Sequence, residues 1–236
     1  MGIFEEVLNK IDGGRVLDVA THEGGFVHIL KDNLQSYTQI IGIDINVQAI
    51  VKAHNSIGNK QIKFMVMNAE QLNFANNSFD TVSISASLHH LTDIRRVLTE
   101  MMRVLKPGGN FIVAEMHRDG QTEAELTTIF LHHWVASVDT ALGNIHNKTL
   151  TRQDLISYVA ELGMKHVDCF DQSDRTTNPL DKEMMDHLDN MIAAAIQRAE
   201  KAASYAELKR QGEILYQRLH KVGACREPIL VIVAKK

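Results

Sequence analysis

The sequence is poor in cysteine, and this shortage excludes one class of protein. Its 236 residues contain two cysteines, Cys169 and Cys225. Two cysteines so far apart give no short-spaced disulfide framework, so a small disulfide-stapled scaffold is excluded and a reducing compartment is expected. The chain is long enough to bury a hydrophobic core without such crosslinks. We therefore expect one domain spanning residues 1–236.

The chain also lacks an excess of positive charge and any long apolar run. It has 25 Lys plus Arg against 29 Asp plus Glu, a net charge of -4, and its basic residues are scattered. This balance does not favour a nucleic-acid partner. No apolar run approaches the roughly 18 residues that span a bilayer, and the first residues read neither as a secretory leader nor as a myristoylation signal. We expect a cytoplasmic protein with no nucleic-acid and no membrane partner.

The most informative stretch is residues 15–26, RVLDVATHEGGF. A short apolar run carrying Asp18 leads into a turn at Gly24 and Gly25, and apolar residues at helical spacing follow. This order predicts a buried strand, a tight turn and the start of a helix. Because the first amides of a helix have no partner within it, and glycine lets a ligand approach the backbone, the turn is a candidate ligand cradle.

Strands and helices alternate through the first half of the chain. After the first strand, we predict further strands at residues 39–45, 62–67, 79–85 and 110–116, with helices between them. Such alternation predicts an α/β fold with a parallel sheet and right-handed crossovers. Two more strands, at residues 166–170 and 229–234, are expected near the end of the chain.

Additional helices are predicted in the second half. Capping boxes at Thr122 and Thr151 predict helices over residues 122–142 and 155–162. A long helical pattern at residues 181–222 fits two helices or one that bends near Ala203. Residues 118–150 and 181–222 are therefore interpreted as helical insertions, which form either a cover over a substrate site or the contact of a homodimer.

Polar residues follow the predicted strands at the edge where open parallel sheets bind ligands. Asp18 ends the first strand, Asp44 the second and Asn68 the third, while residues 85–90 follow the fourth. An acid in the place of Asp44 can accept hydrogen bonds from both hydroxyls of a ribose. The G-x-G-x-x-G pattern of dinucleotide sites is absent, which favours another nucleoside ligand.

At this point the chain resembles the class I S-adenosylmethionine-dependent methyltransferases, of the small-molecule type. Five segments carry the resemblance, in the family's order: VLDVATHEGG, IIGIDIN, MNAEQLNF, FDTVSISASLHHL and RVLKPGGNFIVAE. The resemblance implies a Rossmann-like, doubly wound seven-stranded sheet of order 3-2-1-4-5-7-6 with the last strand antiparallel. It also implies S-adenosylmethionine as the cofactor.

The resemblance assigns expected roles to individual residues. Asp18 would order the turn and face the cofactor's amino group, Asp44 would hold its ribose, and Ser85 would offer a carbonyl to its ammonium. The full expected cofactor set is Asp18, Ala20, Thr21, His22, Gly24, Asp44, Ile45, Asn68, Ala69, Glu70, Ser85 and His90. The chain departs from the family where Ala20 and His22 replace glycines and Asn68 replaces an acid, so the contacts to the methionine part are open.

Methyl transfer is an in-line displacement that needs a base only when the acceptor must lose a proton. Histidine suits this task near neutral pH, and the candidates chosen are His89, His117 and His133. Imidazole and carboxylate groups also bind divalent metals. The candidate metal ligands, which are clustered in sequence, are Glu115, His117, His132, His133, Asp139 and His146. Their spacing matches no zinc signature, so metal binding is the less favoured alternative.

The sequence thus predicts an enzyme that moves the methyl group of S-adenosylmethionine to an oxygen or nitrogen of a small organic acceptor. One alternative is a cofactor-binding or regulatory protein with little catalysis, prompted by His22 in the turn. Another is a metal-assisted variant that uses the histidine cluster.

Overall fold

The computed structural model describes residues 3–173 and 176–236 and contains one seven-stranded sheet of order β3-β2-β1-β4-β5-β7-β6. The strands are β1 (Arg15–Val19), β2 (Gln39–Asp44), β3 (Ile62–Val66), β4 (Phe79–Ser85), β5 (Leu105–Met116), β6 (Lys165–Gln172) and β7 (Ile229–Lys235). β1 to β5 pair in parallel, and β7 runs antiparallel to both β5 and β6. The predicted α/β fold class, strand order and antiparallel last strand are confirmed.

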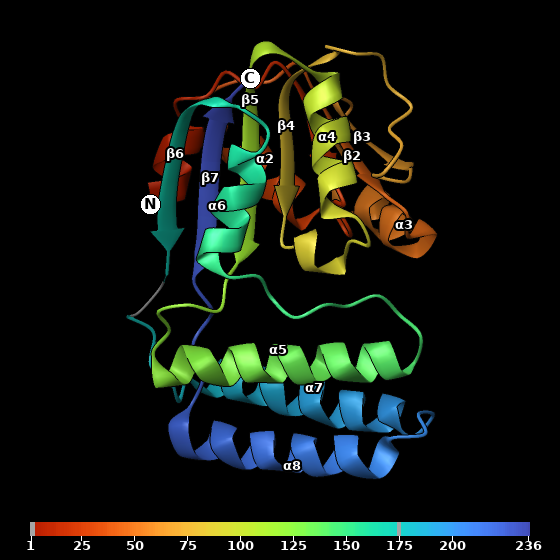
Figure 1. Cartoon of the computed structure of the whole chain (residues 1–236), viewed down its shortest axis with the longest axis vertical. Coiled ribbons are helices and arrows are strands. Elements are labelled where there is room, and N and C mark those ends of the chain that lie inside the picture. Colours follow the sequence, from red (N-terminus) through yellow and green to blue (C-terminus); the bar gives the residue numbers. More distant parts are fainter. Residues whose placement is uncertain (1–2, 174–175) are drawn as a thin grey trace.

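Helices connect the strands and cover both faces of the sheet (Figure 1). One face buries apolar side chains of α4 and α6, and the opposite face buries those of α1, α2 and α3. The parallel strands β1, β2 and β4 are almost fully buried, as their continuous apolar runs predict, whereas the edge strand β3 exposes three of its five residues. The helices that flank the sheet are α1 (Ile3–Leu8), α2 (Gly25–Asn33), α3 (Val47–Ser56), α4 (Ile94–Val104) and α6 (Arg152–Ala160).

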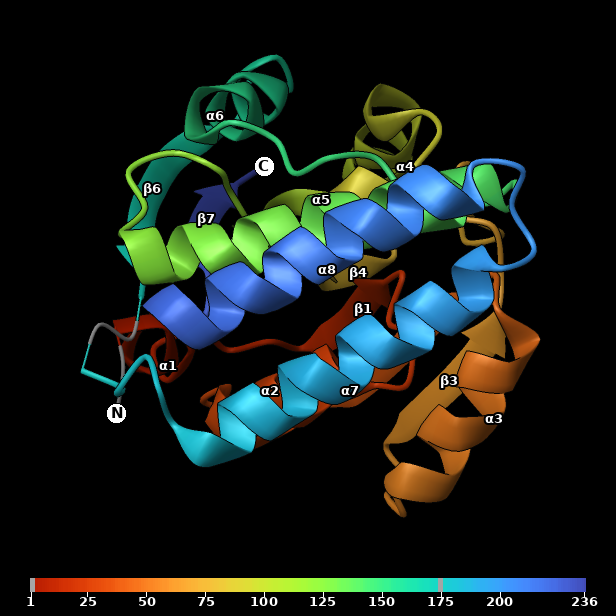
Figure 2. The same cartoon turned by 90° about the horizontal axis from the view of Figure 1, so that it is seen from below.

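A third layer, formed by α5 (Glu123–Ala141), α7 (Lys182–Ala199) and α8 (Tyr205–Val222), lies across the carboxyl ends of the parallel strands (Figures 1 and 2). It has a hydrophobic core of its own, in which Trp134 is central. The Trp134 indole donates a hydrogen bond to the Leu208 carbonyl at 2.9 Å, and Gly212 lies directly against its ring. We name this group of three helices the helical layer.

Local sequence signals explain where these helices begin. Thr122 and Thr151 form complete capping boxes with Glu125 and Asp154, so both predicted caps are present. The pattern at residues 181–222 resolves into two helices separated near Ala203, as one of the two expected alternatives has it. No helix in residues 3–173 or 176–236 is long and apolar enough to cross a membrane.

The largest difference from a predicted strand boundary is at the start of β5. β5 starts at Leu105 rather than at Asn110, because Leu105 pairs with Phe79 and a register irregularity accommodates Pro107 and the two glycines after it. α1 ends at Leu8 although apolar spacing continues to Ile11. Ile11 packs in the core beneath the sheet from an irregular segment, so its burial does not require helix.

Candidate functional site

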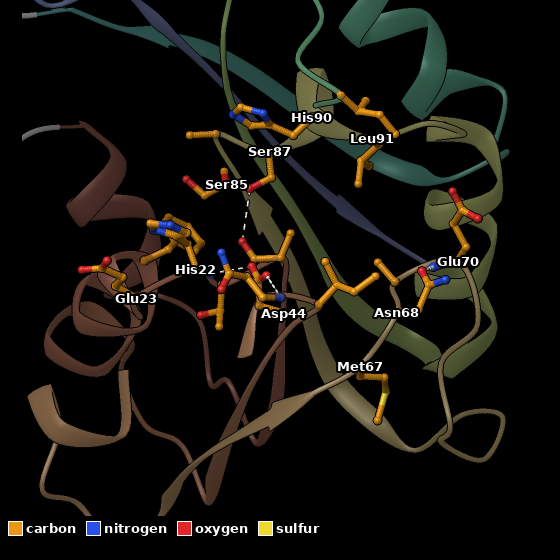
Figure 3. A pocket seen from close by; sticks show the side chains of 18 of the residues that line it. His22, Glu23, Asp44, Met67, Asn68, Glu70, Ser85, Ser87, His90 and Leu91 are labelled. Atoms are coloured by element: carbon orange, nitrogen blue, oxygen red, sulfur yellow. Dashed lines mark hydrogen bonds between the residues drawn. The ribbon is translucent and has the colours of Figure 1, made fainter. Parts of the chain in front are cut away.

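A cavity of about 850 Å³ lies at the carboxyl ends of β1, β2, β3 and β4. Its walls come from the segments that follow these four strands, and Figure 3 shows the side chains that point into it. A cavity of this size accommodates a nucleoside-sized ligand. Ten of the predicted cofactor residues line it: Ala20, Thr21, His22, Asp44, Ile45, Asn68, Ala69, Glu70, Ser85 and His90.

Two predicted cofactor residues do not line the cavity. Asp18 is 1% exposed and lies beneath the turn, where its carboxylate accepts hydrogen bonds from the hydroxyls of Thr21 at 2.6 Å and Ser83 at 2.8 Å. Burial raises the pKa of the Asp18 carboxyl to about 7. Gly24 faces the ring of Phe64 instead of the cavity. Asp18 therefore does not line the cavity, and its position fits the other expected role, that of ordering the turn.

The turn keeps a left-handed backbone at the two positions where the resembled family has glycine. The φ angles are 54° at Ala20 and 49° at His22. A side chain in this region costs about 1–2 kcal/mol, so surrounding contacts must hold the turn in place. The carboxylate of Asp44 supplies one such contact, because it accepts the backbone N–H of His22 at 2.9 Å. The His22 side chain lies at the wall of the cavity and leaves its volume open.

Asp44 presents unused acceptor capacity to the cavity. Its Oδ2 accepts from His22 and its Oδ1 accepts the N–H of Asn46 at 2.8 Å. A carboxylate has about four acceptor positions, so two remain for a ligand. Both oxygens are also fixed in space by these backbone bonds. This arrangement suits the paired hydroxyls of a ribose.

Two backbone carbonyls converge near the end of β4. The Ser87 hydroxyl lies 2.6 Å from the carbonyl oxygen of Ser85 and 3.2 Å from that of Ala20. One hydroxyl proton cannot fully satisfy both oxygens, so the pair retains acceptor capacity beside the cavity. An ammonium group carries several donors and matches such a pair.

The opposite wall is more apolar. Ile45 and Met67 contribute side chains there, and Ile45 is 70% exposed despite being large and apolar. Asn68 uses its side-chain oxygen to accept the backbone N–H of Glu70 at 2.9 Å, which closes a turn after β3. Its amide nitrogen is then the group available to a ligand. This wall fits a flat heterocycle with polar edges.

None of the histidines predicted as catalytic lines the cavity. His89 is 2% exposed and hydrogen-bonds to Glu115, and His133 places Nε2 2.8 Å from the Thr149 hydroxyl. His117 directly follows β5, where its Nε2 is 3.2 Å from Asp171. The cavity is reached instead by His90, which follows β4 on the short 3-10 helix η1 (Leu88–His90). Direct proton transfer by His89, His117 or His133 would require movement of these groups.

Burial also weakens two of the histidines as bases. It lowers the pKa of His90 to about 4, with further lowering by His89 and His146. Burial, together with Lys148 and Arg118, lowers the pKa of His133 to about 4. Both rings are therefore neutral near pH 7 and have little driving force to take up a proton.

The structure brings together only part of the predicted metal set. His132 and His146 lie beside His89, with one possible ligand atom from each residue within 4.8 Å of the others. Glu115 and Asp139 lie behind this group as hydrogen-bond partners of His89 and His146. His117 is elsewhere, and His133 turns towards Thr149. His89, expected as a base, is thus a member of the histidine group.

Several lining residues lie outside the predicted cofactor set. Most are chain neighbours of predicted ones, so the same strand-end signal could have included them: Glu23, Gly25, Phe26, Asn46, Met67, Ala86, Ser87, Leu91 and Thr92. Ile145 is different, since it reaches the cavity from the loop between α5 and α6. No sequence pattern marks its contact.

Comparisons with known proteins identify a family whose model matches most of the chain. Residues 3–168 match the model of the ubiE/COQ5 methyltransferase family. A ubiquinone/menaquinone biosynthesis C-methyltransferase UbiE from a Marinomonas species is 30% identical over 160 residues, which cover 66% of this chain and 61% of that protein. A demethylmenaquinone methyltransferase from Renibacterium salmoninarum is 29% identical over 159 residues, with the same two coverages.

These alignments cover about 61% of the length of the two curated relatives. A similar fold is found in phosphoethanolamine N-methyltransferase 2 from Haemonchus contortus, solved in complex with S-adenosylhomocysteine. The TM-score is 0.58 at 16% identity, over 99% of this chain and 52% of that chain.

Proposed function

The chain belongs to the ubiE/COQ5 methyltransferase family, and from this premise we propose that it transfers the methyl group of S-adenosylmethionine to a small organic acceptor. When bound, the sulfonium cofactor supplies an activated methyl group. The protein's task is then to hold cofactor and acceptor in line and to keep water away.

One observation carries the proposal. At the carboxyl edge of the sheet, the Asp44 carboxylate retains acceptor positions, while the carbonyls of Ala20 and Ser85 converge on Ser87 in the same cavity. These groups match the ribose hydroxyls and the ammonium of S-adenosylmethionine. Ile45, Met67 and the Asn68 amide would contact the adenine.

We propose that the acceptor contacts a part of the chain that lies outside the family match. The family match ends at residue 168, before α7 and α8. The helical layer lies over the strand ends, so we propose that it forms the cover of the acceptor site rather than a dimer contact (Figure 2). One relative is named as a C-methyltransferase of ubiquinone/menaquinone biosynthesis and the other as a demethylmenaquinone methyltransferase. We therefore propose carbon as a further candidate for the methylated atom, beside the oxygen or nitrogen expected from the sequence.

Calorimetric titration with S-adenosylmethionine and S-adenosylhomocysteine tests the cofactor half of the proposal. Binding of both ligands is expected, and no heat from either would overturn it. Incubation with methyl-labelled cofactor and candidate phenols, amines and quinols tests the transfer half, with mass spectrometry of the product identifying the acceptor atom. Tight cofactor binding without transfer to any acceptor would favour the regulatory alternative.

A further inference from the structure

Three histidines from different parts of the chain pack into one group beside the cavity. His89 lies on η1, His132 on α5 and His146 in the loop that follows α5. The ring centroids of His132 lie 4.8 Å from those of His89 and His146, and His89 and His146 are 5.6 Å apart. The His89 side chain is 2% exposed and that of His146 is 8% exposed. We propose that His89, His132 and His146 bind one divalent ion of the zinc class.

The ring nitrogens are oriented for this task. Nδ1 of His89 lies 3.1 Å from Oε1 of Glu115, and Nδ1 of His146 lies 2.8 Å from Oδ2 of Asp139. A carboxylate acceptor fixes the proton on Nδ1, which leaves Nε2 with a lone pair. Histidine ligands of zinc are held by carboxylates in this way.

Distances between the candidate ligand atoms suit a small tetrahedral site. Nε2 of His146 lies 3.1 Å from Nε2 of His132, and all three candidate ligand atoms fall within 4.8 Å of one another. Zinc–nitrogen bonds of about 2.0–2.1 Å in tetrahedral geometry place ligand nitrogens about 3.3 Å apart. Side-chain shifts of about 1 Å are therefore enough to complete the site.

Charged groups beside the histidines offset part of the charge of a divalent ion. Glu115 and Asp139 provide two carboxylates, and Arg198 of α7, 2.7 Å from Asp139, holds that carboxylate in place and neutralises part of its charge. Glu115 is similarly fixed, since it accepts the backbone N–H groups of Ser87 and Leu88. Three protein ligands leave the fourth position of a tetrahedral ion open.

The proposed site adjoins the cavity. His90 lines the cavity (Figure 3). Its ring centroid lies 4.2 Å from the ring centroids of both His89 and His146. Ile145, the neighbour of His146, also lines the cavity. The ion would therefore lie behind the wall formed by His90. The inference does not depend on methyl transfer, because metal binding is measured without cofactor.

The test uses the whole chain, purified without a histidine tag and stripped of metal. Zn²⁺ titration by calorimetry is expected to give one equivalent bound, and Co²⁺ is expected to give the visible spectrum of a four-coordinate ion. His132→Ala and His146→Ala should each weaken Zn²⁺ binding at least about tenfold, and Asp139→Asn should weaken it less.

His133→Ala is the matched control, because His133 is adjacent to His132 on α5 but hydrogen-bonds to Thr149. Its Zn²⁺ affinity should equal that of the unchanged chain. Binding of less than about a tenth of an equivalent would overturn the proposal and indicate that His132 and His146 share only a hydrogen bond. Equal losses in His133→Ala and His146→Ala would also overturn it. Circular dichroism without metal checks folding, and His146→Ala, in a loop, repeats the test if His132→Ala does not fold.

Discussion

The carboxylate of Glu115, at the end of β5, lies 3.1 Å from Nδ1 of His89 and also accepts the backbone N–H groups of Ser87 and Leu88 at 2.9 and 2.7 Å. One buried side chain on β5 thus fixes the segment after β4 that carries His90 into the cavity. This contact links core stability to the shape of the site.

Replacing Glu115 by Gln should therefore destabilise the fold. The amide keeps the size of the side chain but places donors against N–H groups, which leaves buried donors without partners. We expect the free energy of unfolding, measured with urea, to fall by about 2–4 kcal/mol. Glu161→Gln is the control, because its ion pair with Arg95 is exposed to solvent and should contribute little to stability. Equal effects of the two changes would contradict the assigned role of Glu115.

Asp44→Ala should weaken the binding of S-adenosylhomocysteine. It removes a charged acceptor of the ribose hydroxyls and also frees the His22 amide that supports the turn. The expected loss is about 2–4 kcal/mol in a calorimetric titration. Asp32→Ala, an exposed change on α2, should leave the dissociation constant unaltered. An unchanged constant for Asp44→Ala would show that the ribose is bound elsewhere.

Asp18 should make the stability of the fold depend on pH. Its pKa is about 7 in the folded chain against an ordinary 3.8, so the folded state holds the proton more tightly. The protonated Asp18 carboxyl makes its full contribution to the stability of the fold below about pH 4, and this contribution is lost as pH rises through 7. Between pH 5 and pH 8, the unchanged chain should lose about 2–3 kcal/mol relative to Asp18→Asn. Parallel pH profiles for the two proteins would show that the Asp18 carboxyl is not perturbed.

Gly212→Ala should destabilise the helical layer. A Cβ at this position would lie 2.5 Å from Cζ2 of Trp134, whose indole is fixed by its bond to Leu208. Overpacking of this kind costs about 1–3 kcal/mol, which thermal unfolding can measure. Gly58→Ala is the matched control, because open space surrounds that position and its backbone needs no glycine. If both variants unfold at the same temperature, α8 does not pack on Trp134 as described.

The fold class, the strand order and many of the residues around the cavity were predicted from the sequence. The alternation of apolar runs and helical patterns predicted the α/β class, whereas the strand order and the expected cofactor residues were implied by the resemblance, and ten of those residues line the cavity. The burial of Asp18 beneath the turn was not predicted, because the sequence does not reveal which side of a turn a carboxylate occupies. Here Thr21 and Ser83 draw it inward.

The histidines were harder to assign for a related reason. His89 and His146 lie far apart in the chain, and they meet only because the loop after α5 runs along η1, with the Asn147 N–H bonded to the His89 carbonyl at 2.8 Å. Spacing within a single segment cannot predict such a meeting. For the same reason His133, the sequence neighbour of His132, turns away from the group.

The histidine group joins parts of the molecule that otherwise belong to separate cores. His89 is anchored to the sheet through Glu115, whereas His132 and Asp139 belong to α5 in the helical layer (Figure 1). An ion held there would crosslink the two, so its occupancy and the seating of α5 over the strand ends would each favour the other by an equal free energy. Removal of the ion by a chelator would then weaken the seating of α5 and so change access to the cavity.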